Sequence, residues 1–324
     1  MLRAVRARID RIELTPRQFE LLAFAALVSL TLIVFTGAAV RLSDSGLGCP
    51  DWPRCYGHVY PPLHSHALIE FSNRVVSGLV GVIVVVTALL AWRRRPLRRD
   101  LALLALALPA GVVAQAVLGG YTVEEKLAPG FVMAHFGLSM IILVAAMLLF
   151  WRARTAEPGT GARGDPLTVW SIRALVPLAA IAIFAGTAAT AAGPHSGGLV
   201  GQHIKRLTFE GTDTLNWTVH AHGAIAFAFG IAAVVVWVIA ERRAADAQVR
   251  RALSWLCVLI AAQGVIGVVQ YEAHLPTELV WVHVVAASLC WLAVLWAAAA
   301  CGRPETRRER KPGQIRASVM ARNP

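Results

Sequence analysis

Residues 20–42 read ELLAFAALVSLTLIVFTGAAVRL, and no charged side chain interrupts positions 21–40. A helix needs about 20 consecutive apolar residues to cross the hydrocarbon core of a bilayer. Further apolar blocks lie near residues 68–92, 101–120, 130–151, 170–192, 218–240, 252–270 and 279–301. The pattern predicts an all-α integral membrane protein with eight transmembrane helices.

The composition of the whole chain agrees with this prediction. Of its 324 residues, 57% are hydrophobic and 15% are charged, whereas a soluble domain carries about 25% charged residues. Pro109 and Gly111 interrupt the weakest block, 101–120, but membrane helices tolerate such breaks where neighbouring helices satisfy the backbone. The first block lacks a small-residue cleavage site, so we expect it to be a retained span and not a signal peptide.

The net charge of +12 is explained by orientation in the membrane. In an eight-span chain, 25 of the 31 Lys and Arg residues fall in the two termini and in the second, fourth and sixth loops. Basic loops stay in the cytoplasm, so we expect both termini inside and no nucleic-acid partner. The remaining basic residues are Arg41, Arg54, Arg74, Lys126, Lys205 and Arg206.

All ten histidines fall in the outward loops or in the first turns of helices that enter from outside. His135, His220 and His283 each lie a few residues inside a predicted span, where an ionisable residue is costly and is by default a functional candidate. The structural alternative is an interfacial histidine hydrated by lipid headgroups. Five others are expected in loops or at the mouth of a pocket: His58, His64, His66, His195 and His203.

The chain also repeats, with a period of roughly 148 residues. We therefore predict two pseudo-symmetric four-helix bundles, residues 1–160 and 161–324. Because each bundle has an even number of spans, both bundles have the same orientation in the membrane, as parallel repeats do. The matching segments are Gln115-Ala-Val-Leu-Gly119 with Gln263-Gly-Val-Ile-Gly267, and Phe35-Thr-Gly37 with Phe184-Ala-Gly186.

The repeat pairs residues of the second and fourth helices of each bundle. Counting back 63 residues from His283 gives His220, and counting back 62 from His135 gives Asn73. Two imidazoles that face each other in an apolar bundle can hold heme. We therefore predict a closed histidine pair at His220 and His283, and an incomplete site with an open axial face at His135 and Asn73. His222 lies about 200° around the helix from His220, so only one of the two can serve one iron.

Two further pairs complete the candidate residues. Glu70 and Asn73 share a helix face at spacing i, i+3, and Arg74 follows, so Glu70 and Arg74 are either catalytic groups or a structural ion pair near the interface. Cys49 and Cys55 lie in the first outward loop, where an oxidising compartment permits a disulfide. A metal site formed by the two cysteines with His58 is the alternative.

Several of these segments resemble the heme A synthase family, and the resemblance covers roughly residues 20–300. The stretch from Ser45 to Pro53 is highly specific. The segments are Gly37-Ala-Ala-Val-Arg41, Ser45-Gly-Leu-Gly-Cys49-Pro-Asp-Trp-Pro-Arg-Cys55, Ile69-Glu-Phe-Ser-Asn-Arg74, Leu118-Gly-Gly-Tyr-Thr122 with His135, and Gly193-Pro-His-Ser-Gly197.

The resemblance implies a reaction and its cofactors. The family oxidises the C8 methyl group of heme O to a formyl group and so makes heme A for cytochrome oxidases. It implies heme b at His220 and His283, with His135 as a ligand of the substrate heme and Glu70 essential to catalysis. It further implies a redox-active or structural pair at Cys49 and Cys55. We expect a bacterial plasma-membrane protein that receives heme O, from heme O synthase, and electrons from a membrane or extracytoplasmic donor.

The chain departs from the family pattern in two places. Many members read Glu-x-x-His-Arg in the second helix, whereas this chain has Asn73 before Arg74, and in this it resembles actinobacterial members. Two-histidine coordination of the substrate heme therefore does not carry over. The sixth helix reads His220-Ala-His222 in place of a single His-Arg.

The asymmetry of the two sites suggests a mechanism and leaves two alternatives. In the mechanism, heme O enters the N-terminal bundle, and two successive hydroxylations of one methyl group give a geminal diol that loses water. Glu70 positions the methyl-bearing edge or relays protons. A di-heme b-type electron-transfer cytochrome is the first alternative, and it predicts two complete ligand pairs. A transporter with a histidine proton relay is the second.

Overall fold

The computed structural model describes residues 13–155, 163–199 and 201–305. This part of the chain contains eight long helices, each long and apolar enough to span a membrane, which confirms the predicted all-α membrane fold. They are α2 (Pro16–Leu42), α3 (Ser65–Ala91), α4 (Arg99–Glu124), α5 (Pro129–Arg154), α6 (Pro166–Ala192), α7 (Thr214–Arg242), α8 (Ala247–Glu272) and α9 (Thr277–Ala300). Two-residue strands β1 (Arg163–Gly164) and β2 (Arg303–Pro304) pair in parallel.

Local sequence sets where several helices begin. Thr15 precedes Pro16 and forms a capping box with Gln18 at the start of α2. The carboxylates of Asp165 and Asp213 accept hydrogen bonds from backbone N–H groups in the first turns of α6 and α7. Helix α4 runs continuously through Pro109, as expected of a membrane helix whose neighbours compensate for the missing hydrogen bond.

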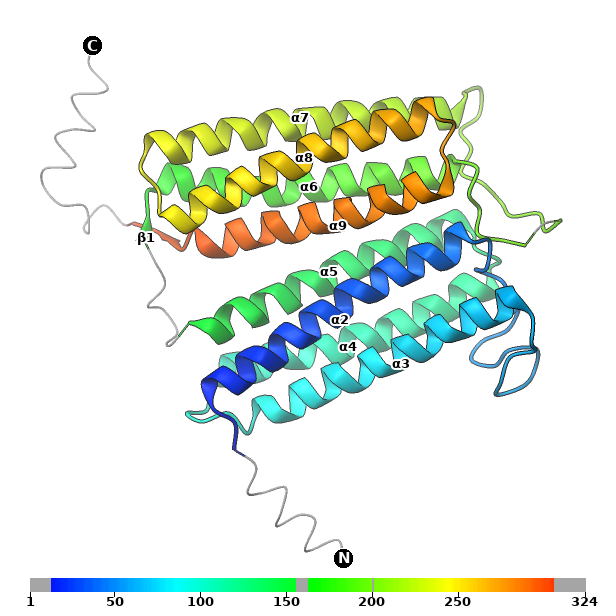
Figure 1. Ribbon diagram of the computed structural model, residues 1–324, viewed down its shortest axis with the longest axis horizontal. Helices are drawn as coiled ribbons and strands as arrows, with labels where there is room; N and C mark the ends of the chain where they lie inside the picture. Colours follow the sequence, from blue (N-terminus) through cyan, green and yellow to red (C-terminus); the bar gives the residue numbers. More distant parts are fainter. Residues whose placement is uncertain (1–12, 156–162, 200, 306–324) are drawn as a thin grey trace, which may run out of the picture.

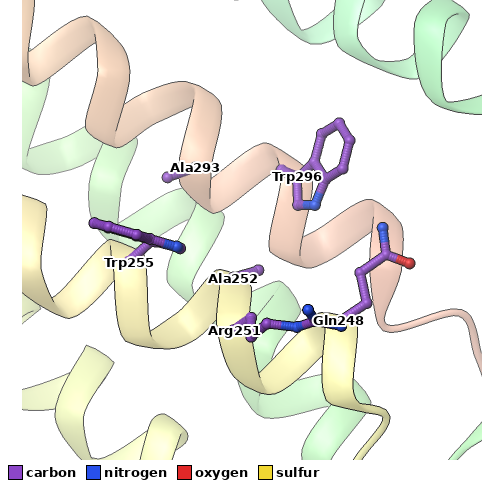
Figure 2. A pocket seen from close by; sticks show the side chains of 6 residues that line it. All are labelled: Gln248, Arg251, Ala252, Trp255, Ala293 and Trp296. Atoms are coloured by element: carbon purple, nitrogen blue, oxygen red, sulfur yellow. The ribbon is translucent and has the colours of Figure 1, made fainter.

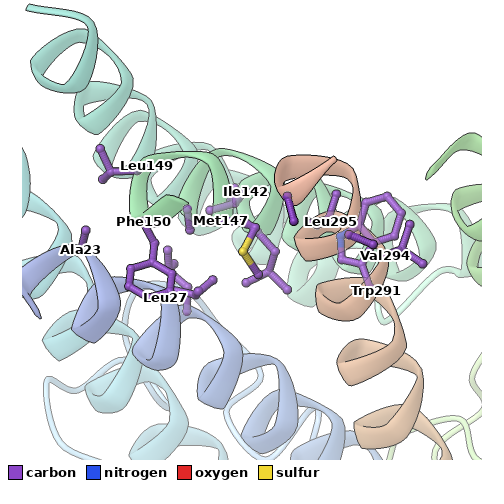
Figure 3. Close-up of a cluster of buried hydrophobic side chains, with 14 of the residues drawn as sticks. Ala23, Leu27, Ile142, Met147, Leu149, Phe150, Trp291, Val294 and Leu295 are labelled. Atoms are coloured by element: carbon purple, nitrogen blue, oxygen red, sulfur yellow. The ribbon is translucent and has the colours of Figure 1, made fainter. Parts of the chain in front are cut away.

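The helices form two groups of four, α2–α5 and α6–α9, which lie side by side (Figure 1). Helix α9 packs on both α2 and α5, and α5 also contacts α6. Figure 3 shows the apolar core at this contact, with Leu27, Met147 and Phe150 from the first group opposite Trp291 and Leu295 from the second. The predicted division at residue 160 lies outside the described residues.

Two tryptophans of α9 tie the groups together by hydrogen bonds to backbone carbonyls. The indole of Trp291 donates to the Met140 carbonyl of α5 at 3.0 Å, and this bond is buried. The indole of Trp281 donates to the Phe35 carbonyl of α2 at 3.0 Å. Helices that associate in lipid gain little from the hydrophobic effect, so these hydrogen bonds and the close packing hold the groups in register.

One end of the molecule carries every histidine, and we call it the histidine end. It comprises the connections α2–α3, α4–α5, α6–α7 and α8–α9 with the adjoining helix turns, on the right of Figure 1. The α2–α3 and α6–α7 connections meet there, because the amide of Gly46 donates to the Gly197 carbonyl at 2.7 Å. Helix α2 begins and α9 ends at the opposite end.

Candidate functional site

His222 and His283 face each other inside the second group of helices. They lie in the third turn of α7 and the second turn of α9, and their ring centroids are 6.2 Å apart with an interplanar angle of 78°. Two imidazoles that share one metal, each with its nitrogen about 2 Å from the ion, have centroids roughly 6 Å apart. The spacing of this pair therefore fits two axial ligands on opposite sides of one iron.

The structure does not bring His220 to this position, although the sequence pairs His220 with His283. The His220 side chain is exposed, and its Nδ1 is 2.7 Å from the Asn216 carbonyl of its own helix. Its ring packs at 6.0 Å against the ring of Tyr271 on α8. A change of two residues turns the helix by about 200°, which is why His222 points toward α9 and His220 points away.

A signal for His222 is present in the sequence. The match of Phe35 with Phe184 has an offset of 149 residues, and the same offset carries Asn73 to His222. Counting back 62 residues from His283, the spacing of Asn73 and His135, instead reaches Ala221, which lies between His220 and His222. The two offsets differ by one residue, so the repeat alone does not choose between His220 and His222.

The surroundings of His222 leave one ring nitrogen for a ligand. Its Nδ1 lies 3.0 Å from the Ala182 carbonyl of α6, and a carbonyl can only accept, so Nδ1 carries the proton. The lone pair is then on Nε2, as in histidines that bind metals. Gly186 gives the ring its space, since a Cβ there would lie 3.0 Å from the ring Cε1.

His283 is held by packing and not by hydrogen bonds to its ring. Its Nδ1 is buried without a partner among the described residues. A Cβ at Gly267 would lie 3.2 Å from its Cε1, and the side-chain amide of Gln263 donates to its backbone carbonyl at 2.9 Å. No described residue hydrogen-bonds to a ring nitrogen of His283, so the ring is free to coordinate a heme iron.

The first group of helices repeats this arrangement around His135. The Gln115 amide donates to the His135 carbonyl at 3.0 Å, and a Cβ at Gly119 would lie 3.2 Å from the ring Cε1. Its Nδ1 is likewise buried and without a partner in the described part of the chain. Two helix pairs that are distant in sequence thus present a histidine in the same local environment.

The place equivalent to His222 is occupied by Asn73 on α3. The Asn73 Oδ1 accepts a hydrogen bond of 2.8 Å from the Thr36 hydroxyl of α2. A Cβ at Gly37 would meet nothing within 4 Å, whereas at Gly186, its counterpart in the second group, the ring of His222 fills that space. The first group therefore presents one imidazole, that of His135. It has an open space where the second group has the ring of His222.

Glu70 and Arg74 connect α3 to the loop that carries the two cysteines. One Glu70 carboxylate oxygen accepts from the Cys49 amide at 2.7 Å, and the other accepts from Arg74 at 2.5 Å. Arg74 also donates to the carbonyls of Asp51 and Arg54, at 3.0 and 2.8 Å. Glu70 is buried, and its contacts tie the cysteine loop to α3.

Cys49 and Cys55 form a disulfide, as predicted, and both residues are fully buried. With both sulfurs in the disulfide, neither is a thiolate that could bind a metal, so the alternative of a metal site with His58 is wrong for this form. Among the described residues, no cluster of three His, Cys, Asp or Glu side chains is arranged to hold an ion. The Trp52 ring of this loop packs on Gly120, so the loop covers the end of α4.

Three other histidines make contacts outside the two histidine sites, His66 from the first turn of α3 and the other two from loops. His66 Nδ1 lies 2.9 Å from the Ser45 hydroxyl, and His195 Nε2 lies 2.6 Å from the Leu275 carbonyl. His58 stacks on Tyr60 with ring centroids 5.7 Å apart.

A surface groove of about 280 Å³ lies far from the histidine end. Gln248, Arg251, Ala252, Trp255, Ala293 and Trp296 line it (Figure 2). Trp296 is about 20 Å along α9 from His283, at about 1.5 Å of rise per residue. The groove therefore takes no part in the histidine sites.

A model of the COX15-CtaA family, described as cytochrome oxidase assembly protein, matches residues 20–68 and 63–200. The match covers more than half of the chain and includes the cysteine loop, Glu70, Asn73 and His135. This chain belongs to that family. The match ends before α7, so the pair of His222 and His283 rests on the geometry of the structure.

Curated relatives carry the name heme A synthase. The protein from Shewanella oneidensis is 34% identical over 178 residues, which are 49% of this chain and 50% of that protein. The protein from Lysinibacillus sphaericus is 36% identical over 135 residues, 41% of this chain and 44% of that protein. This chain thus spans about half the length of the curated relatives that it matches.

Proposed function

We propose that this membrane protein is a heme A synthase, which oxidises the C8 methyl group of heme O to a formyl group. The observation that carries the proposal is the asymmetry between the pair of His222 and His283 and the incomplete site at His135 and Asn73. Membership of the cytochrome oxidase assembly family and the names of the relatives support it. The two sites serve different purposes, electron transfer and chemistry on a bound substrate.

In the C-terminal group, His222 and His283 are the proposed ligands of heme b, and His222 replaces His220 in this role. Such a heme would supply one-electron transfer. The protein contributes orientation. The Ala182 carbonyl keeps the Nε2 of His222 unprotonated, while Gly186 and Gly267 let both rings lie close to neighbouring backbone.

In the N-terminal group, His135 is the proposed ligand of the substrate heme O. Asn73 is a poor iron ligand and is already bonded to the Thr36 hydroxyl, so the other axial face stays open. The reaction is two successive hydroxylations of one methyl group by an external oxidant, which supplies the oxygen and takes up four electrons overall, followed by loss of water from the geminal diol. The farnesyl tail of heme O remains in the surrounding lipid.

Glu70 and Arg74 act, in this proposal, as positioning residues. Both carboxylate oxygens of Glu70 are engaged by Arg74 and by the Cys49 amide. The ion pair therefore holds the disulfide loop across the histidine end, where it excludes water from the substrate site. A role in proton relay requires the carboxylate to leave one of these partners.

The proposed orientation puts the histidine end at the outer face of a bacterial plasma membrane and both termini in the cytoplasm. The basic residues of the opposite end support this orientation through the positive-inside rule. The proposed partners are heme O synthase, which supplies the substrate, and a membrane or extracytoplasmic electron donor.

The second candidate is a di-heme b-type cytochrome, and hemes extracted from the purified protein separate the two. We expect the full chain, produced in a host that makes heme O, to contain heme B with some heme O and heme A. Heme B alone, in a host that makes heme O, would support the cytochrome. A protein without Soret absorbance would contradict both.

A further inference from the structure

We propose that Arg41 and Arg206 form a binding site for the propionate carboxylates of the heme held by His222 and His283. The proposal rests on the proposed function, because it assumes a heme at this pair. It adds the groups that would bind the polar edge of that heme.

The two guanidinium groups meet at one backbone oxygen. Arg41, at the end of α2, donates from Nη2 to the Thr190 carbonyl of α6 at 3.3 Å and from Nε to the His195 carbonyl at 3.1 Å. Arg206, in the connection after α6, donates from Nη2 to the same Thr190 carbonyl at 3.1 Å. Two like charges therefore share a single neutral acceptor.

Neither arginine forms an ion pair with a carboxylate in the described residues. Seven other arginines there do so: Arg17, Arg74, Arg95, Arg98, Arg154, Arg243 and Arg250. Arg41 and Arg206 are both partly buried, and burial lowers the pKa of Arg206. Partly buried cations without a counter-ion are costly, and a carboxylate between the two guanidinium groups would remove that cost.

The place of the pair in the fold selects the ligand. Thr190 lies four residues after Gly186, about 6 Å farther along α6 at about 1.5 Å per residue, and Gly186 abuts the His222 ring. The arginines therefore lie beyond the histidine pair, toward the histidine end. A heme in an apolar bundle turns its two carboxylates toward the aqueous end, and the planar fork of arginine matches a carboxylate.

Arg41 is held in place before any ligand binds. Its stem lies against the segment after α6, where a Cβ at Gly197 would lie 3.0 Å from the Arg41 Cγ. Gly197 has a φ of +86° and in turn accepts the amide hydrogen of Gly46. Because Arg41 belongs to the first group of helices and Arg206 to the second, a bound carboxylate would also join the two groups.

The test compares Arg41→Gln, Arg206→Gln and the double variant with Lys205→Gln, a control at an exposed neighbouring lysine. The full chain is purified with its heme, and two properties are measured. These are the reduction potential of the low-spin heme and the rate at which heme transfers to apomyoglobin. Positive charge favours the reduced iron, so each arginine variant should have a lower potential, and the double variant the lowest. Heme loss should accelerate about tenfold per arginine, the effect of about 1.4 kcal/mol.

Reconstitution with heme whose propionates are methyl esters completes the comparison. In the parent protein, the methyl ester should lower heme retention by as much as the double substitution does. In the double variant, the ester should cause no further loss of heme. Arg206→Lys, which keeps the charge, should recover part of the loss. Because Arg206 lies outside the helices, its variants decide the matter even if Arg41→Gln fails to fold.

Two results would overturn the proposal. In the first, the double variant behaves like Lys205→Gln in potential and heme retention. In the second, it keeps its heme properties but loses a co-purifying anionic phospholipid, which would make the ligand a lipid phosphate. A parent protein that contains no heme would instead overturn the proposed function, so the two failures are distinguishable.

Discussion

The imidazole of His222 lies opposite that of His283, with centroids 6.2 Å apart and nearly perpendicular planes. The Ala182 carbonyl accepts the Nδ1 proton of His222, while no described residue bonds to the Nδ1 of His283. One ring is thus oriented by a hydrogen bond and the other by packing on Gly267.

We predict that His222→Ala loses the low-spin heme of the C-terminal group, whereas His220→Ala retains it. The ring of His222 faces His283, and the ring of His220 is exposed beside Tyr271. Soret absorbance per protein, with a pyridine hemochrome assay, measures the difference in purified protein. Loss of this heme in His220→Ala, with normal content in His222→Ala, would return the ligand role to His220.

The glycines beside the rings give a test that leaves every ligand in place. Gly186→Ala and Gly267→Ala should each cost about 1–3 kcal/mol of heme binding, since an added methyl group forces a ring to shift. Gly264→Ala is the matched control, because a Cβ there meets nothing within 4 Å. Heme content after dilution in detergent reports the effect. Equal retention in all three variants would contradict the packing described for these rings.

Asn73→His should convert the first site into a second closed pair. The offset of 149 residues relates Asn73 to His222, and the change also removes the bond from the Thr36 hydroxyl. We expect a heme bound there to become six-coordinate and low-spin. Absorbance and electron paramagnetic resonance spectra measure the change. An unaltered spectrum in protein that has retained two hemes would argue against this equivalence.

Glu70→Gln should loosen the disulfide loop. It breaks a buried ion pair, an effect of about 3 kcal/mol, and weakens the acceptor of the Cys49 amide. Reduction of the Cys49–Cys55 disulfide by a water-soluble phosphine should be faster than in Glu125→Gln, a control at an exposed carboxylate. The readout is alkylation of the released thiols.

The outcome of that experiment also separates positioning from catalysis at Glu70. If heme A output falls while the disulfide is reduced at the control rate, Glu70 acts on the substrate directly. If both change together, the carboxylate acts through the loop, as its contacts with Arg74 and Cys49 imply.

Much of the fold is determined by the sequence alone. A block of apolar residues long enough to cross a bilayer has few alternatives to a helix, so every predicted span is present. The disulfide was predictable as well, since Cys49 and Cys55 are close in sequence and so need little of the fold to meet. The match of Gln115 with Gln263 likewise anticipated the equal environments of His135 and His283.

Only the tertiary structure decided which residues meet within those helices. His220 and His222 are both present in one turn of α7, and the rotation of that helix against α6 and α9 selects between them. That rotation arises from packing over the whole helix, and in the sequence only the distant match of Phe35 with Phe184 points to His222. The meeting of Arg41 with Arg206 depends on how two groups of helices dock, because those residues are far apart in the chain and belong to different groups. The length of an apolar segment determines whether it spans the membrane, whereas the direction of each polar side chain depends on the neighbouring helices.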